Sequence, residues 1–305
     1  MGVDLATFLA VYGAVVDGNL AGWSLQGTPH VGIGGSHGNY ETDSSPCHSD
    51  LFQYGVDKVV IPQFEELYKL QPNDNTANYN LQVLRDFRAT RFQESINKNP
   101  YFSYGPFGGI AVSQAAFTFI YRFMANHSAE HPAGRLDGHV LKSFFGVTGE
   151  PGNFKWTKGT EKIPDNWYRR NTLDAYTIPY FQTDILYFAE TVPQILDVGC
   201  NQGAVNTYNT FSAETISGGA YTTESAAKNP LCFASATLAA GAYSLLGLSG
   251  SGLTQLNNAL AGVQKALGTT CPPINNLTLS AFEACPGFTL YGGPTAPVAP
   301  GAIQN

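Results

Sequence analysis

Charged residues are scarce in this 305-residue chain, in which Asp, Glu, Lys and Arg together make up 13% of the positions. The charges that are present sum to −7, and the isoelectric point is near 5.3. This balance offers no basic surface for phosphate backbones, so we expect no nucleic-acid partner. A low charge content together with 12% aromatic residues is typical of a compact, well-buried body.

Long apolar runs are also missing. None reaches the roughly 18 residues that a membrane-spanning helix needs, so we expect no membrane association. Residues 1–4 lack the basic segment that opens a secretion signal. No low-complexity break or internal repeat divides the chain. We therefore expect one domain over residues 1–290, followed by a Gly/Pro/Ala-rich tail over 291–305.

Cysteine is sparse, and no two cysteines have the C-x-x-C spacing that would suggest zinc. Cys47 stands alone in the first half, and the last third of the chain holds Cys200, Cys232, Cys271 and Cys285. The sequence predicts one or two disulfides there and leaves their pairing open. Glycosylation sequons begin at Asn126 and Asn276. Together these features predict a secreted glycoprotein from an oxidising compartment.

Helical periodicity recurs along the chain and predicts a mainly α (all-α) fold. We expect helices over residues 5–16, 56–70 with an interruption at Pro62, 79–97, 110–124, 136–145, 180–192, 234–246 and 253–267. Small and β-branched residues between 203 and 229 predict a short hairpin. Arg88 and Arg91 lie beside the apolar stripe of the 79–97 helix, and we expect them to be solvated or to cap it.

The polar stretch 37–50 concentrates reactive side chains. The glycine run 32–37 just before it follows no predicted strand, so it does not predict a nucleotide site. Within the stretch 37–50, the Ser, His and Asp residues lie too close in sequence for a catalytic triad. Glu41 and the neighbouring oxygens suit a hard cation, and the alternative is a loop that merely solvates its charges. His127, His131 and His139 lack ligand spacing and are expected to be surface or capping residues.

Several blocks resemble, in order and spacing, the fungal haem-thiolate peroxidases, that is, the chloroperoxidases and unspecific peroxygenases. These blocks are residues 12–19, 37–50, 88–102 with the apolar helix that follows, and 199–207 with 231–233. The last two segments are similar to the C-terminal part of ascomycete members. The resemblance covers most of the chain, and agreement of several blocks in order is more specific than any single block.

The resemblance implies a single all-α domain with haem b in an aromatic-lined cleft. Its central motif has the form Glu-Gly-Asp-x-Ser, so Glu41, the carbonyl of Thr42 and Ser45 would hold Mg²⁺ against a haem propionate. A dication offsets a buried propionate charge that would otherwise be unfavourable. The implied partners are hydrogen peroxide and a small apolar or aromatic substrate. We expect a monomer or a weak dimer.

The chain departs from the family pattern at three points. No Pro-Cys-Pro motif is present, although its thiolate drives O–O cleavage in the family. Cys47 lies in the magnesium loop, so we do not expect it to replace that thiolate, and His48 stands in place of the motif arginine. No carboxylate lies between residues 108 and 116. Gln114 could hydrogen-bond peroxide but cannot move a proton.

Two interpretations follow from these departures. In the first, Met1 is an internal methionine, and the full-length form is a peroxidase or peroxygenase that oxidises or halogenates small organic substrates with hydrogen peroxide. In the second, the chain is a haem-free, catalytically degenerate pocket protein that binds or reshapes a fungal secondary metabolite.

Overall fold

The computed structural model describes residues 1–16, 42–50, 52, 58–244 and 248–287, which form a mainly helical fold as predicted. The α-helices are α1 (Val3–Val16), α3 (Ile61–Lys69), α4 (Leu81–Lys98), α5 (Gln114–Met124), α6 (Gly138–Phe145), α7 (Ile178–Thr191), α8 (Ala213–Ser217), α9 (Thr223–Lys228), α10 (Pro230–Gly241), α11 (Gly250–Leu267) and α12 (Leu279–Glu283). A π-helix, η2 (Gly108–Ser113), precedes α5, and two 3-10 turns flank α7, namely η3 (Thr172–Asp174) and η4 (Pro193–Leu196). The glycine run 32–37, Glu41 and the predicted tail 291–305 lie outside the described residues.

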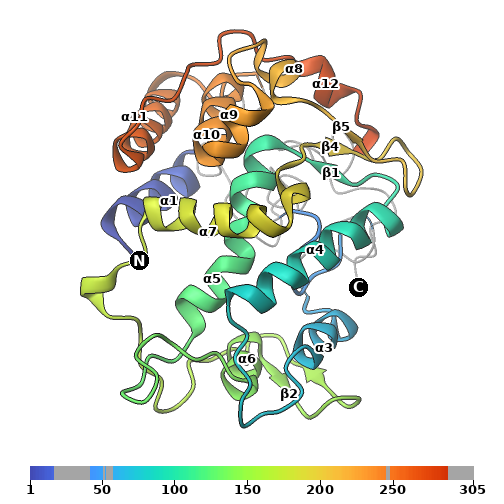
Figure 1. The fold of residues 1–305 in the computed structure, drawn as a ribbon, viewed down its shortest axis with the longest axis vertical. Helices are drawn as coiled ribbons and strands as arrows, with labels where there is room; N and C mark the ends of the chain where they lie inside the picture. The colour runs from blue at the N-terminus through green and yellow to red at the C-terminus, as the bar shows by residue number, and fades with distance from the viewer. Residues whose placement is uncertain (17–41, 51, 53–57, 245–247, 288–305) are drawn as a thin grey trace.

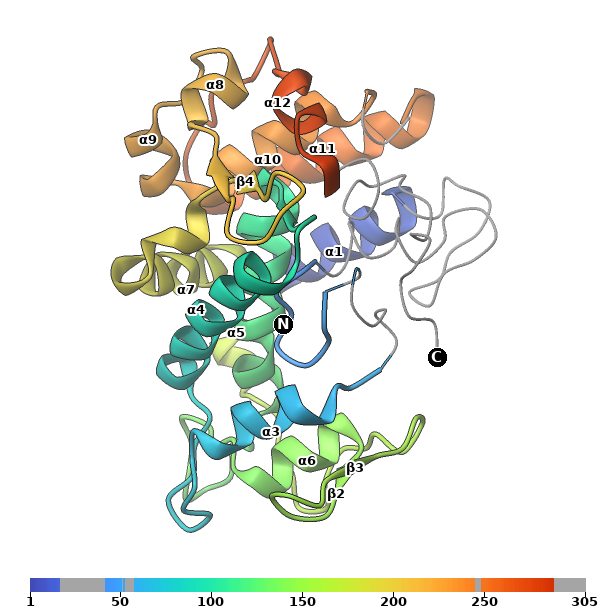
Figure 2. The same ribbon diagram turned by 90° about the vertical axis from the view of Figure 1, so that its right-hand side faces the viewer.

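Helix α5 runs through the middle of the molecule (Figure 1, Figure 2). Helices α3 and α6 lie at one end, and α8 to α12 lie at the other. Helix α1 packs along α11, and its start is tied to α7. The backbone N–H of Gly2 donates to the carbonyl of Tyr176 at 2.6 Å, and the Asp4 carboxylate accepts from the N–H of Ile178 at 2.9 Å. Helix α1 is therefore packed against elements that lie far from it in the sequence.

The strands within the described residues are short. Strands β1 (Ser103–Tyr104), β4 (Gly199–Cys200) and β5 (Asn209–Thr210) form an antiparallel sheet in the order β1-β4-β5, and β2 (Val147–Thr148) pairs with β3 (Lys155–Trp156). The hairpin predicted between 203 and 229 is wrong in position, because β5 pairs back with β4 and the residues after it form α8 and α9. The side chains of Ser212 and Thr222 cap those helices by accepting hydrogen bonds from Thr215 and Ser225.

Two other predicted helices differ from the structure. Pro62 does not interrupt a helix but occupies the first turn of α3, where a missing N–H leaves no hydrogen bond unmade. The segment predicted as one helix over 110–124 begins as the π-helix η2. A Cβ atom at Gly109 would lie 2.5 Å from the Tyr104 ring, so only glycine fits this close approach. The remaining predicted helices are confirmed, with shifted ends.

Helix α5 contributes to two apolar cores. Phe119 packs with the core around α7 and α10, whereas Phe117 packs with the core around α3, α4 and α6. In the C-terminal third, the predicted disulfides form and their pairing is Cys200–Cys285 and Cys232–Cys271. Cys47 is a buried free thiol. The disulfides join segments 85 and 39 residues apart and so restrict the unfolded chain.

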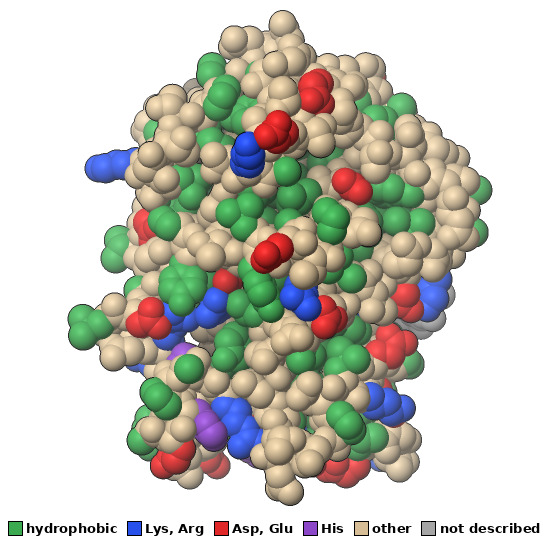
Figure 3. All heavy atoms as spheres, in the orientation of Figure 1, with side chains coloured by type: hydrophobic (Ala, Val, Ile, Leu, Met, Phe, Trp, Pro, Cys, Tyr) green, Lys and Arg blue, Asp and Glu red, His purple; other side chains and the backbone are tan. Residues whose placement is uncertain are grey.

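Charged side chains are spread thinly over the surface. On the face in Figure 3 they lie singly or in pairs of opposite sign. Such exposed pairs include Lys228 with Glu224, at 2.6 Å, and they contribute little to stability. Within the described part of the chain, no helix is both long enough and apolar enough to cross a bilayer.

Candidate functional site

The polar loop 42–50 lies against one face of α4. Residues Arg88, Arg91, Ser95 and the helix-terminal Asn99 follow one another at spacings of three and four, which places them on the same face. All four are buried, so the prediction that the two arginines are solvated or cap the helix is wrong. Their polar atoms are instead used to hold the loop.

Arg88 is fully buried and bonds to uncharged groups. Its guanidinium donates to the Ser44 hydroxyl at 3.1 Å, to Gln114 Oε1 at 3.2 Å and to the Tyr104 hydroxyl at 2.6 Å. It also lies over the rings of Phe92, Tyr104 and Phe117 at 5.3 to 5.4 Å. A buried cation needs such partners because desolvation is costly. Ser44 has a positive φ of 60°, so Arg88 holds the loop at a backbone conformation that serine seldom adopts.

Asn99 joins the two aspartates of the loop. Its side-chain nitrogen donates to Asp43 Oδ2 at 3.0 Å and to Asp50 Oδ2 at 2.9 Å. Asp50 also accepts from the Ser44 N–H at 2.8 Å and from the Ser95 hydroxyl at 2.9 Å. Burial, and secondarily the charge of Asp43, raise the pKa of Asp50 to about 6. We call this set of buried polar residues, together with Arg88, Tyr104 and Gln114, the polar network.

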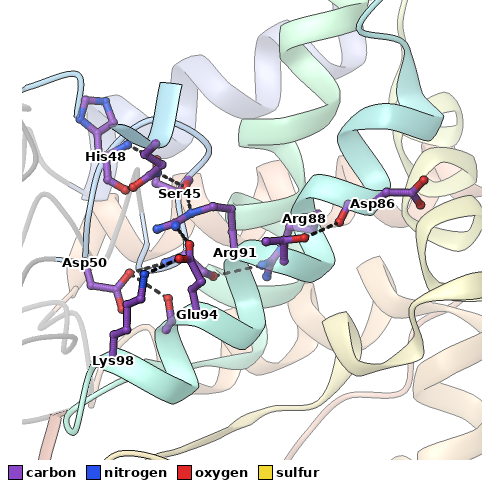
Figure 4. Close-up of polar contacts among 12 residues, drawn as sticks. Ser45, His48, Asp50, Asp86, Arg88, Arg91, Glu94 and Lys98 are labelled. Carbon is purple, nitrogen blue, oxygen red and sulfur yellow. Dashed lines mark hydrogen bonds and ion pairs between the residues drawn. The ribbon is translucent and has the colours of Figure 1, made fainter. Parts of the chain in front are cut away.

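Arg91 reaches from α4 towards the loop (Figure 4). Its Nε donates to the carbonyl oxygen of Ser45 at 3.1 Å, and its guanidinium also pairs with Glu94. Burial lowers the pKa of the Arg91 guanidinium. Gln63 of α3 donates to the same Ser45 carbonyl at 2.7 Å and to the carbonyl of His48 at 2.8 Å. The loop is therefore fixed by helices on two sides.

Of the three predicted magnesium ligands, the structure describes Thr42 and Ser45. Glu41 lies outside the described residues, the Thr42 hydroxyl donates to the Asp43 carbonyl at 3.2 Å, and Ser45 is buried. The Ser45 hydroxyl accepts from the His48 N–H at 3.4 Å. The described residues contain no group of three His, Cys, Asp or Glu arranged to hold a metal. The positive charge of the nearby Arg91 also disfavours a bound dication. The described residues therefore do not form a magnesium site by themselves.

A cavity of about 290 Å³ lies on the other side of η2 and α5. We call it the apolar cavity, and its lining comes from α1, η2, α5, α7, α10 and α11. The lining residues are Leu5, Phe8, Leu9, Tyr12, Phe107, Ala111, Val112, Ala115, Ala116, Phe119, Ile178, Phe181, Leu231, Ser235 and Val263. This volume lies near the lower end of the range for ligand pockets, and the hydrocarbon lining suits an apolar ligand.

The segment 111–115 separates the two features. Ala111, Val112 and Ala115 line the apolar cavity, whereas Gln114 turns into the polar network. Its amide nitrogen donates to the Tyr104 hydroxyl at 2.7 Å and to the Ile195 carbonyl at 3.2 Å. Gln114 is fully buried in these contacts. The Gln114 amide thus bonds within the polar network and not to the cavity, and its hydrogen bond to peroxide stays a prediction.

The described lining of the apolar cavity contains no carboxylate, imidazole, amine or thiol. Cys47, the free thiol, packs in the core around Phe64, and its carbonyl accepts from the Val60 N–H at 2.9 Å. Apart from the phenol of Tyr12, the described cavity residues thus supply no group that could shuttle a proton or ligate haem iron. A haem group does not fit these residues alone.

The other histidines agree with the surface prediction. His131 and His139 are exposed, and His127 is half-buried with Nδ1 3.0 Å from the Pro132 carbonyl. The sequence did not single out Ser95, Asn99 or Tyr104. The helical spacing of polar residues from 88 to 99 was the signal that could have identified the first two.

Comparison with known proteins places this architecture in a class of oxidoreductases. Residues 1–172, more than half of the chain, match the family model described as peroxidase, family 2. The chain belongs to this family, and the resemblance to haem-thiolate peroxidases predicted from the motifs is confirmed.

Named relatives support the same conclusion. The aromatic peroxidase fscJ of Fusarium equiseti is 32% identical over 240 residues, which cover 72% of this chain and 54% of that protein. The dothistromin biosynthesis peroxidase dotB of Dothistroma septosporum is 29% identical over 305 residues, covering 93% of this chain and 72% of that protein. An aromatic peroxygenase of Cyclocybe aegerita is 29% identical over 128 residues, covering 41% of this chain and 34% of that protein. The chain thus spans about half the length of the Fusarium relative.

Proposed function

We propose that this chain binds a small apolar or aromatic organic molecule in the apolar cavity, and that hydrogen-peroxide-dependent oxidation or halogenation is the reaction it serves. The observation that carries the proposal is the cavity itself, lined by phenylalanines and aliphatic side chains from six helical segments. Membership of the peroxidase family supports the reaction class. The names of the aromatic peroxidase and aromatic peroxygenase relatives support an aromatic substrate.

The cavity residues have a positioning role in this proposal. Phe119 and Phe181, with ring centroids 5.7 Å apart, offer ring surface to an aromatic ligand. The aliphatic side chains exclude water, because an apolar lining offers it few hydrogen-bond partners. Binding and orienting the substrate is the contribution that these residues make to the reaction.

Haem b is the proposed cofactor, on the strength of the family. A reconstitution experiment tests it: the chain is expressed with haem supplied, reduced, and its absorption recorded with carbon monoxide. A red-shifted Soret band of the thiolate type, together with consumption of hydrogen peroxide that depends on an aromatic substrate, would support the proposal and exclude the haem-free alternative. Folded but colourless protein that consumes no peroxide would contradict the proposal for this chain.

The magnesium site remains part of the proposal, with Glu41, the Thr42 carbonyl and Ser45 as its ligands. It is supported by the burial of Ser45. Thermal unfolding with and without Mg²⁺ tests the idea. We expect a rise in Tm with Mg²⁺ that is lost in Glu41→Gln and kept in Glu150→Gln, a change at an exposed carboxylate. An equal rise in both variants would exclude this ligand set.

A haem-free pocket protein that binds or reshapes a secondary metabolite is the second candidate. The observation in its favour is the absence of any carboxylate, imidazole, amine or thiol from the described cavity lining. It is distinguished from the first candidate by the same preparation: tight binding of an aromatic molecule by colourless protein supports it, and peroxide-dependent turnover contradicts it.

Secretion and glycosylation are proposed from the two disulfides and the sequons. Asn276 is exposed at a bend of the chain. Asn126 is half-buried, and its amide bonds to the Tyr168 N–H at 2.8 Å and the Asn166 carbonyl at 3.3 Å. In a secreting fungal host we expect Asn276→Gln to remove a glycan that an endoglycosidase otherwise releases, whereas Asn126→Gln leaves it in place. Loss of the glycan only in Asn126→Gln would contradict this assignment.

A further inference from the structure

Ser235 is, with Tyr12, one of two polar side chains among the described residues that line the apolar cavity. It lies on α10, is 4% exposed and belongs to the cavity lining. Its hydroxyl makes no hydrogen bond to any residue in the described part of the chain. Thr237, which lies on the same helix and is equally buried, differs from Ser235 in this respect. Its hydroxyl donates to the Phe233 carbonyl of the helix at 2.8 Å. The Ser235 oxygen is not one of the fully buried unpaired atoms of the described residues; it is open to the cavity, where a ligand can become its hydrogen-bond partner.

Water is a poor candidate for that partner. Ordered buried waters are held by two to four polar groups. Among the described residues that line the cavity, only Ser235, with its hydroxyl, and Tyr12, with its phenol, have polar side chains. A ligand with its own apolar body and one polar atom satisfies the hydroxyl and the hydrocarbon lining together.

The volume of the cavity limits the size of that ligand. A dry cavity of about 150 Å³ is large enough to bind benzene. The apolar cavity, at about 290 Å³, therefore suits a molecule of about two fused rings. Because a serine hydroxyl both donates and accepts, either a phenol or a ring ketone can meet it.

We propose that Ser235 determines the specificity of the apolar cavity by hydrogen-bonding a hydroxyl or carbonyl oxygen on an aromatic ligand of about two rings. This inference rests on the proposed function, whose binding site it shares. It adds that the cavity prefers oxygenated rings over the parent hydrocarbons. Ser235 positions the ligand and takes no part in bond making.

Binding of 2-naphthol and naphthalene tests the proposal, because the two compounds differ only by a hydroxyl group. Each is titrated by fluorescence against the 305-residue chain and two variants. Ser235→Ala removes the cavity hydroxyl, and Thr237→Val removes an equally buried hydroxyl outside the lining. We expect the wild type to prefer 2-naphthol. Ser235→Ala should weaken 2-naphthol binding about three- to tenfold and leave naphthalene unchanged, and Thr237→Val should change neither affinity.

The outcomes separate this inference from the proposed function. Equal binding of both compounds by the wild type, or an unchanged preference in Ser235→Ala, overturns the role of Ser235 and leaves the cavity as a binding site. Failure of the wild type to bind either compound overturns both the inference and the cavity as a two-ring site. Circular dichroism of Ser235→Ala shows whether the variant is folded, and a second variant, Ser235→Cys, keeps the size of the side chain while weakening its hydrogen bond. The peroxide assay described above reports on the reaction independently of these binding results.

Discussion

The Nη1 atom of Arg88 donates a hydrogen bond to the hydroxyl of Ser44 at 3.1 Å, across 44 positions of the sequence. Neither residue is exposed to solvent. The bond joins the middle of α4 to a loop that resembles the cation-binding motif of haem-thiolate peroxidases. The conformation of that loop therefore depends on a cation buried in the core.

Replacing Arg88 by Met should be strongly destabilising. The change leaves the Tyr104 hydroxyl, Gln114 Oε1 and the Ser44 hydroxyl without their common donor. We expect the free energy of unfolding to fall, because each buried neutral group left without its hydrogen-bond partner costs about 1–3 kcal/mol. Urea denaturation followed by circular dichroism measures the loss. As a control, Lys98→Met removes an exposed cation from the same helix and should have a much smaller effect; equal effects would show that Arg88 does not hold the loop.

Asp50 should make stability depend on pH. Its pKa is raised from 3.8 to about 6 in the folded protein, so the folded state binds more protons between these values than the unfolded state does. The free energy of unfolding should therefore decrease as pH rises from about 4 to about 6, by up to about 3 kcal/mol for this group. Urea denaturation across this pH range measures the decrease.

The variant Asp43→Asn isolates the cause of that shift. It removes the neighbouring charge, the second-largest contribution after burial, so the pKa of Asp50 should fall and the decrease in stability should move to lower pH. Asp86→Asn, at an exposed position on α4, should leave the pH profile of the wild type in place. A profile that Asp43→Asn does not move would mean that another group causes it.

Gln114 and Ala115 are adjacent in sequence but face the polar network and the apolar cavity, respectively. Substitutions at the two positions should therefore affect different properties, stability at Gln114 and ligand binding at Ala115. Gln114→Met removes hydrogen bonds to Arg88 and Tyr104 and should cost about 1–3 kcal/mol of stability, with 2-naphthol binding retained. Ala115→Phe fills the apolar cavity and should abolish that binding while the chain stays folded. The two variants are compared by urea denaturation and fluorescence titration. Loss of binding in Gln114→Met alone would place Gln114 in the cavity.

The disulfide pairing predicts how many free thiols the unfolded, unreduced chain contains. Unfolded without reductant, the chain should react with one equivalent of a thiol reagent, at Cys47, because the other four cysteines form disulfides. Replacing Cys232 and Cys271 together by Ser should lower the free energy of unfolding by about 2–5 kcal/mol. Cys47→Ser serves as the control for loss of a thiol without loss of a crosslink. A count of three or five thiols would contradict the assigned pairing.

Much of the fold was predictable from local features. The spacing of Leu84, Phe87 and Phe92 predicts α4, and the scarcity of charge predicts a well-buried body. The helix over 110–124 was predicted as regular, because periodicity does not report the contact between Tyr104 and Gly109 that accompanies its π-helical start. The caps at Ser212 and Thr222 were readable signals that were missed.

The sequence by itself determined the helical class of this protein, its family and its supply of disulfide-forming cysteines, because periodicity, motif order and residue counts are local or additive properties. Tertiary structure decided that Arg88 is buried rather than solvated, that Gln114 faces the polar network rather than the cavity, and that Ser235 is left with an unused hydroxyl. The physical reason is that burial and hydrogen-bond partners depend on which segments meet in space. A side chain on a helix faces a core, a loop or a cavity according to neighbours that lie tens of residues away.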